Sequence, residues 1–114
     1  MFYFTMDIYS TKPMEEVDIN IFKNVLVNKE IFVSPHALDH LSRGQRKVFK
    51  EQELINILRR ETPRKVYLQR NERYAVYYRK SDGFRKLILD IKDKNITIIT
   101  FIDVLEIPKI ILEK

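Results

Sequence analysis

The feature that most constrains the fold of this chain is a series of four segments in which side-chain polarity alternates with a period of two. They are "KVYLQR" (65–70), "RYAVYYRK" (73–80), "RKLILDIK" (85–92) and "ITIITFIDV" (96–104). Alternation of this kind is typical of strands with one buried face. The connections "NE", "SDGF" and "DKN" are short enough to require antiparallel neighbours. The sequence therefore predicts a four-stranded antiparallel meander.

Two helices are expected before the meander. Ser34 is a favourable N-cap and Pro35 suits the first helical position, so a short helix is predicted over 35–43, ended by Gly44. The segment "EIFVS" (30–34), which runs into Ser34, is interpreted as a short strand. A second helix, "VFKEQELINILRRE" (48–61), ends before a proline. Its inward-facing residues are expected to be Val48, Leu54, Ile55 and Leu58.

The N-terminal part adds a strand and a third helix. Residues 2–9 alternate in polarity, which predicts a strand. A helix is predicted over 13–27, with Thr11 as its cap, although residues 17–21 also alternate like a strand. The helix would turn inward Met14, Val17, Ile21 and Val25. The fold class is therefore α+β, with helices packed on an antiparallel four-stranded meander and an extra N-terminal strand.

The length and composition limit the class of protein. With 114 residues, the chain is expected to form a single domain. It contains no cysteine, so disulfides and thiolate metal ligands are excluded. The N-terminus lacks the basic lead and cleavage site of a signal peptide, and no stretch approaches the roughly 20 apolar residues of a membrane span. A cytoplasmic protein without a membrane partner is expected.

The basic residues are concentrated in one region. Between Arg43 and Lys86 there are 14 Lys/Arg and 5 Asp/Glu, a local charge of +9, whereas the remaining residues carry 7 basic and 11 acidic groups. A concentrated positive field on a small domain favours polyanions, because each neutralised phosphate releases counterions. Nucleic acid is therefore the first partner to consider, and a solvated basic surface is the alternative.

The strand pattern separates the basic and aromatic residues onto two faces. In 73–80, Ala75, Tyr77 and Arg79 share one face. In 85–92, the apolar side that carries Arg85, Leu87 and Leu89 should be covered by the helices, which leaves Lys86 and Asp90 on the open face. Tyrosines interleaved with cations can stack bases and pair with phosphates, so Tyr77 is a candidate contact. Tyrosine is also simply a favourable strand residue.

Both histidines of the chain lie in "SPHALDHLSRGQR" (34–46). At about 100° per residue, His36, His40 and Arg43 fall within about 60° of one another, while Ala37 and Leu38 point elsewhere. Zinc is disfavoured because there is no third histidine and no cysteine, so neither metal nor cofactor is expected. Imidazoles beside arginines suit acid–base chemistry on a phosphodiester. The same pattern also describes an ordinary exposed helix surface.

The order of elements resembles the RelE-like toxins, in particular a small branch whose first helix carries a His-Ala-x-x-Arg motif. His36 and Ala37 match the start of the motif, Tyr74–Tyr78 fit the first hairpin of the meander, and Thr100 stands where the last strand of the family carries a hydroxyl. The likeness covers residues 31–103, which leaves an N-terminal extension (1–30) and a C-terminal tail (104–114). The sequence departs from the motif at two positions. His40 replaces its arginine, and Arg43 comes one residue early.

The resemblance implies a metal-independent endoribonuclease, in which the 2′-hydroxyl of the RNA attacks the adjacent phosphate. His36 would then be the acid or base, Arg79 and Lys86 the phosphate-binding cations, and Thr100 a hydrogen-bonding hydroxyl. The resemblance also implies a toxin–antitoxin system with an acidic antitoxin protein as partner. The residues expected to contact nucleic acid are His40, Arg43, Arg46, Tyr77 and Arg85.

Two alternatives remain open at the level of sequence. The same basic region could serve a non-catalytic nucleic-acid-binding protein, whose binding would depend steeply on salt. The apolar N-terminal and C-terminal segments could instead serve a protein-interaction domain or a homodimer. The tail "LEIPKIILEK" (105–114) contains Pro108 and is expected to be either an edge segment or an arm that docks on a partner.

Overall fold

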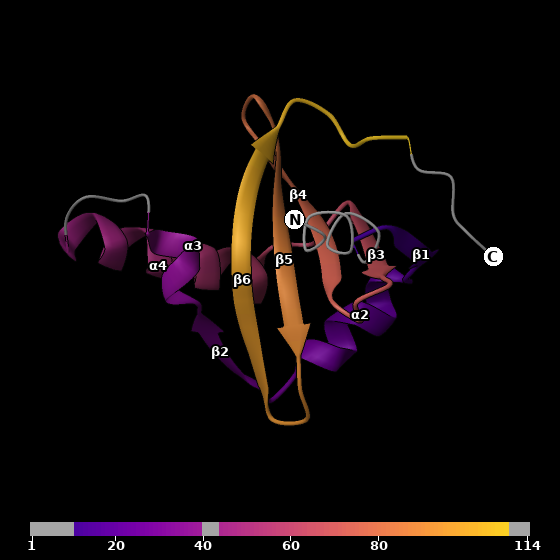
Figure 1. Cartoon of the computed structure of the whole chain (residues 1–114), viewed down its shortest axis with the longest axis horizontal. Helices are drawn as coiled ribbons and strands as arrows, with labels where there is room; N and C mark the ends of the chain where they lie inside the picture. The colour runs from indigo at the N-terminus through magenta and orange to yellow at the C-terminus, as the bar shows by residue number, and fades with distance from the viewer. Residues whose placement is uncertain (1–10, 40–43, 110–114) are drawn as a thin grey trace, which may run out of the picture.

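The computed structural model describes residues 11–39 and 44–109, and Figure 1 shows their arrangement. Within these ranges a six-stranded sheet carries three helices. In chain order the elements are β1 (Pro13–Glu16), α2 (Ile19–Leu26), β2 (Glu30–Val33), α3 (Pro35–Leu38), α4 (Gly44–Arg60), β3 (Lys65–Gln69), β4 (Tyr74–Lys80), β5 (Gly83–Ile91) and β6 (Asn95–Val104). The α+β class is therefore confirmed.

The four predicted segments of alternating polarity form β3, β4, β5 and β6, which pair antiparallel in that order. The sheet is larger than predicted, because a strand is added at each edge. β1 pairs antiparallel with β3, and β2 pairs parallel with β6 from Glu30↔Asn95 to Val33↔Ile98. The sheet is therefore mixed, in the order β1-β3-β4-β5-β6-β2. The strand predicted over 2–9 lies outside the described residues.

The single helix predicted over 13–27 is wrong. Its first part is β1, and α2 begins only after Asp18, whose side chain accepts hydrogen bonds from the backbone amides of Asn20 and Ile21. Asp18 rather than Thr11 is thus the N-cap, and the inward face changes with the new start. Phe22 is buried against the sheet, whereas Ile21 is exposed.

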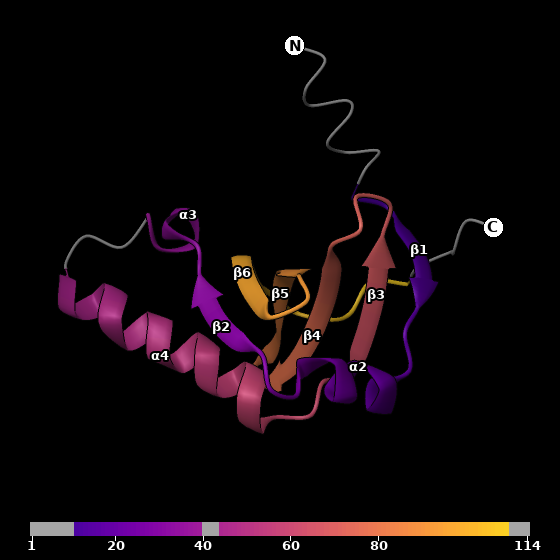
Figure 2. The ribbon, with the colours of Figure 1, turned by 90° about the horizontal axis from the view of Figure 1, so that it is seen from below.

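The two helices predicted before the meander are both present, with different limits. Ser34 caps α3 as expected, accepting a hydrogen bond from the amide of His36. Described helix α3 ends at Leu38, and residues 40–43 lie outside the described part of the chain. Gly44 was predicted to end a helix but instead begins α4. The predicted inward position of Val48 is also wrong, because the first half of α4 extends past the edge of the sheet (Figure 2) and leaves this side chain exposed.

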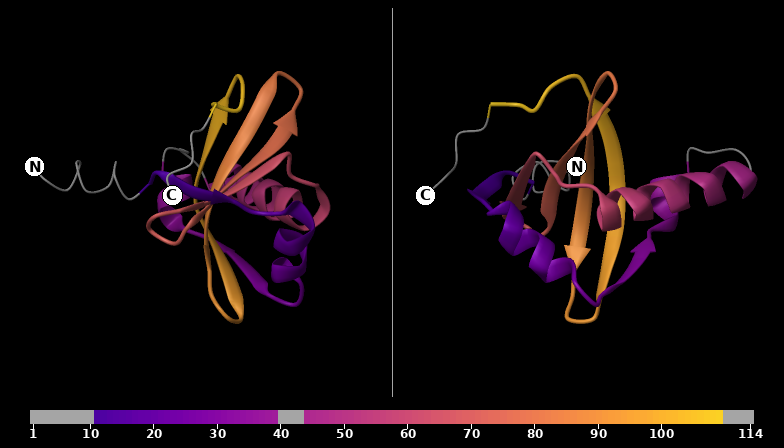
Figure 3. Two further views of the ribbon diagram at one scale, coloured as in Figure 1. Left: turned by 90° about the vertical axis from the view of Figure 1, so that its right-hand side faces the viewer. Right: turned by 180° about the vertical axis from the view of Figure 1, so that it is seen from behind.

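Each of the two faces of the sheet buries its own cluster of hydrophobic residues. We call the side of the sheet on which α2 and α4 pack the helix face. In the right panel of Figure 3, this side is turned toward the viewer. Its core joins Leu54 and Leu58 of α4 and Phe22 of α2 to residues of the sheet, including Leu87 and Leu89. The second face is the opposite side, where a smaller cluster contains Tyr67, Ala75 and Tyr77, with Val104 and Ile107 packed against it. The predicted assignment of faces in β4 and β5 is therefore confirmed.

Of the described residues after β6, 105–109, all but Ile107 are exposed. Ile107 packs against the cluster of the second face, whereas Leu105 is 85% exposed. The rest of the predicted tail, 110–114, lies outside the described residues. None of the described helices is long and apolar enough to cross a membrane.

Candidate nucleic-acid interface

The second face brings together three of the predicted site residues. Arg79 lies opposite Phe84 in the β4–β5 register, and Lys86 lies opposite Tyr77. Because residues two apart on a strand share a face, Arg79 and Lys86 are diagonal neighbours on the second face. Thr100 of β6 pairs with Ile88, two residues along from Lys86. The three side chains thus come from three adjacent strands and share one side of the sheet.

Lys86 is the most unusual cation of this group. Its Nζ lies 5.7 Å from the centre of the Tyr77 ring, and no carboxylate among the described residues pairs with it. Burial lowers the pKa of the Lys86 ammonium from its ordinary value of 10.5. A partly buried ammonium that lies against an aromatic ring and has no carboxylate partner leaves donors available for an anion.

Arg79 differs from Lys86 because its side chain is exposed. Its guanidinium carbon lies 5.3 Å from the centre of the ring of Phe84, the residue opposite it on β5. Arginine on an aromatic face keeps its N–H donors free at the edge of the guanidinium plane. Arg79 can therefore reach a phosphate oxygen without breaking an ion pair.

Tyr77 does not present an open surface for a base. Only 2% of the residue is exposed, and its ring meets Tyr67 edge-on at a centroid distance of 6.2 Å. Burial also raises the pKa of the Tyr77 hydroxyl, with a further contribution from Tyr67. The predicted stacking of a base on this ring would require Ile107 and its neighbours to move. In the structure, the Tyr77 ring lies beside the Lys86 ammonium instead.

Arg85 lies on the helix face, away from Lys86 and Arg79. It is 8% exposed and donates hydrogen bonds to Glu53 of α4 and Asp103 of β6. Its guanidinium carbon also lies 5.3 Å from the centre of the Phe101 ring. A phosphate could reach Arg85 only by displacing these carboxylates, so its structural role explains its position better than nucleic-acid contact does.

Arg85 is the centre of an ionic network that the sequence did not reveal. The network runs from Lys50 through Glu53, Arg85 and Asp103 to Lys80, and Lys80 also pairs with Asp82. It connects α4 to β4, β5 and β6. The hydrogen bonds from Arg85 hold the pKa of Asp103 at about 2, below its ordinary value of 3.8, although burial opposes the shift.

The pKa of Glu53, which belongs to the same network, is subject to two opposing effects. Burial favours the neutral form of this carboxyl, but hydrogen bonds from Lys50 and Arg85 outweigh burial and lower its pKa. The Arg85 guanidinium in turn has a raised pKa, chiefly because it is hydrogen-bonded to Asp103. These groups therefore stay charged over the physiological range.

His36 is exposed at the start of α3. Its Nδ1 lies 3.8 Å from the Asp39 carboxylate, and 77% of the His36 side chain is accessible. α3 packs beside β6, the strand that carries Thr100, and the amide of Ser34 donates to the carbonyl of Ile98 at 2.9 Å. The helix is thus anchored to β6, but the neighbour of the His36 imidazole is Asp39, whereas Arg79 and Lys86 of the second face lie against the rings of Phe84 and Tyr77.

The other predicted contacts are distributed more widely. Arg46 is exposed on the first turn of α4. His40 and Arg43 lie outside the described residues. Among the described residues, no group of three side chains that could ligate a metal lies together.

Comparisons with known proteins return no relatives: no family model, no curated protein and no solved structure matches the chain. The RelE-like resemblance therefore stays a prediction. What the described residues do define is a mixed six-stranded sheet, and on its face opposite α2 and α4 the cations Arg79 and Lys86 have no carboxylate partner among these residues.

Proposed function

We propose that this protein binds RNA through cations of the second face. The observation that carries the proposal is the division of the basic residues into two sets. Lys50, Lys65, Lys80 and Arg85 pair with carboxylates. A second set has no carboxylate partner among the described residues: Arg46, Lys47, Arg59, Arg60, Arg64, Arg73, Arg79 and Lys86. Arg79 and Lys86, which lie on the second face, belong to this second set, whereas Arg46, Lys47, Arg59 and Arg60 stand on α4 and are not part of the proposed interface.

Arg79 and Lys86 are the proposed centre of the interface. Placing an ammonium in a partly buried position without an acidic partner opposes folding. Such a position is more often retained where the group serves a ligand. The geometry supports phosphate contacts, because the two cations are diagonal neighbours and both lack a carboxylate partner.

Fluorescence anisotropy with a labelled single-stranded RNA tests the proposal. The logarithm of the affinity should fall linearly with the logarithm of salt concentration, with a slope of roughly 0.7 for each phosphate contacted. Arg79→Gln and Lys86→Gln should each weaken binding, and each should reduce the slope. Lys94→Gln is a matched control, because Lys94 is exposed in the β5–β6 turn outside the basic region. Salt-independent binding, or equal losses in all three variants, would contradict the proposal.

We also propose, as a second candidate, that bound RNA is cleaved in the manner of a toxin-like endoribonuclease. Its specific support is that α3, which carries His36, packs against β6, which carries Thr100. Thr100 in turn shares the second face with Lys86 and Arg79. An exposed imidazole could take the proton of a 2′-hydroxyl while the cations stabilise the charge that develops on the phosphate. In this role, a small acidic protein would be the expected inhibitory partner.

Cleavage is tested by incubating the protein with RNA in excess EDTA. The expected products carry a 2′,3′-cyclic phosphate, and His36→Ala should abolish them without changing the melting temperature, because the side chain is exposed. Asp39→Asn is a suitable comparison, since it removes the neighbouring charge but leaves the imidazole. Cleavage that survives His36→Ala would overturn the catalytic assignment, whereas RNA binding would stand.

A further inference from the structure

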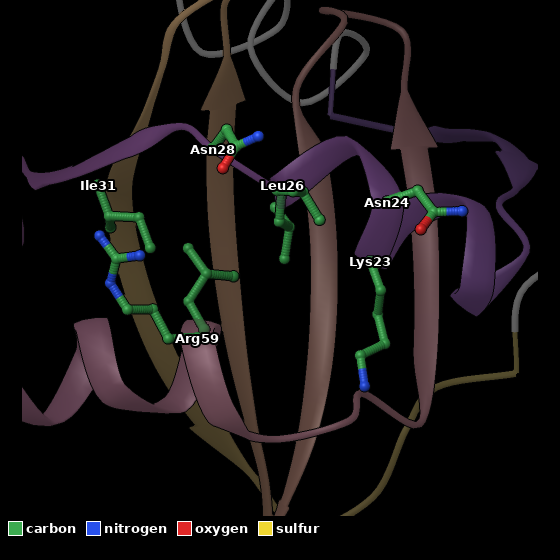
Figure 4. Close-up of a pocket in the computed structure, with 8 residues that line it drawn as sticks. Lys23, Asn24, Leu26, Asn28, Ile31 and Arg59 are labelled. Atoms are coloured by element: carbon green, nitrogen blue, oxygen red, sulfur yellow. The ribbon is translucent and has the colours of Figure 1, made fainter.

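A cleft of about 520 Å³ lies between α2, β2 and α4 on the helix face. Figure 4 shows that Leu26 of α2 and Ile31 of β2 point into it, and Leu58 of α4 also contributes to its lining. Leu58 is buried and the other two are partly buried. The centre of the cleft is therefore apolar and of a size typical for small-molecule sites.

The polar side chains around this apolar centre offer donors and no negative charge. Arg59 rises from α4 beside Ile31, and Lys23 lies at the other end of the cleft (Figure 4). Asn24 and Asn28 complete the polar lining, which contains no carboxylate. The cleft is thus electrostatically suited to an anion.

The two cations are not equivalent. Lys23 Nζ donates to the hydroxyl of Thr62 at 3.1 Å, which holds it at the end of α4. Arg59 has no hydrogen-bond or ion-pair partner in the described part of the chain. A guanidinium presents paired N–H donors that match a phosphate or carboxylate in two-point contact. Arg59 is therefore the cation of the cleft whose donors are available for an anion.

We propose that this cleft binds a small organic phosphate with a planar apolar body, that is, a ligand of the mononucleotide class. The planar group would lie on Leu26, Ile31 and Leu58, and the phosphate would meet Arg59. The side-chain amide of Asn28 can donate to and accept from a polar edge of the ligand. Neither inorganic phosphate nor an uncharged nucleoside would use both parts of the cleft.

Titration calorimetry of the full chain with adenosine monophosphate, adenosine and inorganic phosphate tests the proposal. Only the monophosphate should bind tightly, with each of the other two at least about tenfold weaker. In NMR spectra, backbone amide signals of Asn28, Ile31 and Arg59 should shift with the same saturation curve. Adenosine or inorganic phosphate binding as tightly as the monophosphate would overturn the proposed ligand class, and no saturable binding would overturn the site.

Arg59→Gln is the decisive variant, and Arg60→Gln is its matched control. Both arginines are exposed on α4, but Arg60 does not line the cleft. Arg59→Gln should weaken binding of the monophosphate by roughly tenfold or more, because a charge-assisted two-point contact is lost. Arg60→Gln should change it less than about twofold. Equal effects of the two variants would show non-specific attraction to the helix.

This inference is independent of the RNA interface, because the cleft and the Arg79–Lys86 pair lie on opposite faces of the sheet. Lys86→Gln should leave binding of the monophosphate unchanged while it weakens RNA binding. Either proposal can therefore fail without the other.

Discussion

Arg85 and Asp103 meet across the β5–β6 ladder in a two-point contact, in which Nε and Nη2 donate to the two carboxylate oxygens at 2.8 and 3.2 Å. Arg85 also donates from Nη1 to Glu53 of α4. The buried guanidinium of Arg85 therefore links α4 to β5 and β6. The contact shows how this face of the sheet uses its charge for structure rather than for binding.

Arg85→Gln should lower the free energy of unfolding by about 1–3 kcal/mol, since charged hydrogen bonds are lost and two carboxylates are left without their partner. The lower part of this range is favoured because both carboxylates are partly exposed. Urea denaturation monitored by circular dichroism measures the change. Lys94→Gln, which removes an exposed cation outside the network, should have little effect. Equal stability of Arg85→Gln and wild type would contradict a structural role.

Acid should weaken the fold through Asp103. Because its pKa is about 2 when folded and 3.8 ordinarily, the carboxylate contributes stability above about pH 4. That contribution is lost as the pH falls through the folded pKa. Thermal melts from pH 5 down to 2 should therefore show a steady decline. Arg85→Gln should have a shallower decline over this window, because the cause of the depressed pKa is removed.

Lys86→Met should keep or raise stability while it weakens RNA binding. Burial lowers the pKa of Lys86 when folded, so the charged form opposes folding, and this penalty fades as the pH rises towards the ordinary value of 10.5. An unbranched apolar side chain fills similar space without the charge. Urea denaturation and RNA anisotropy should thus move in different directions. A loss of stability comparable to that of Arg85→Gln would identify Lys86 as structural.

Gly83→Ala should destabilise the β4–β5 turn by more than about 1 kcal/mol. Gly83 has φ of +142°, a conformation that residues with a Cβ rarely adopt, and an added Cβ would clash with the carbonyl oxygen of Val104. Ser81→Ala, at an exposed position in the same turn, serves as the control. The difference in melting temperature between the two variants measures the effect. Comparable melting temperatures would mean that the turn relaxes.

Asp18→Ala should cost about 1 kcal/mol, because the backbone amides of Asn20 and Ile21 lose their side-chain acceptor. Asp18→Asn retains an acceptor oxygen and should restore most of the stability. Chemical denaturation of the two variants distinguishes loss of the cap from loss of the charge. If both variants were equally destabilised, the charge rather than the hydrogen bonds would be responsible.

The meander could be predicted because each strand carries its own alternating pattern and the turns between strands are short. The same alternation assigned Lys86 and Arg85 to opposite faces correctly. It could not show that Arg85 is enclosed by carboxylates, because Glu53 and Asp103 come from elements distant in the sequence.

The parts that were missed depend on contacts between distant segments. β2 was recognised as a strand, but nothing local specifies that it pairs with β6. Local signals misplaced both elements at 13–27: the strand, β1, is Pro13–Glu16 rather than 17–21, and the helix begins only at Ile19, after its cap Asp18. The cleft beside Arg59 lies between α2, β2 and α4. Its presence depends on how far apart the two helices lie on the sheet, and the hydrophobic period of a helix does not determine that distance.

The parallel pairing of β2 with β6 also has a consequence for synthesis of the chain. Glu30 is translated early, but its partner Asn95 belongs to β6, the last of the described strands. A nascent chain therefore exposes Ile31 and Val33 until the ribosome has released β6, and the β2 edge should be among the last parts to form. During that interval, the unpaired edge of β2 is open to pairing with a strand of another chain.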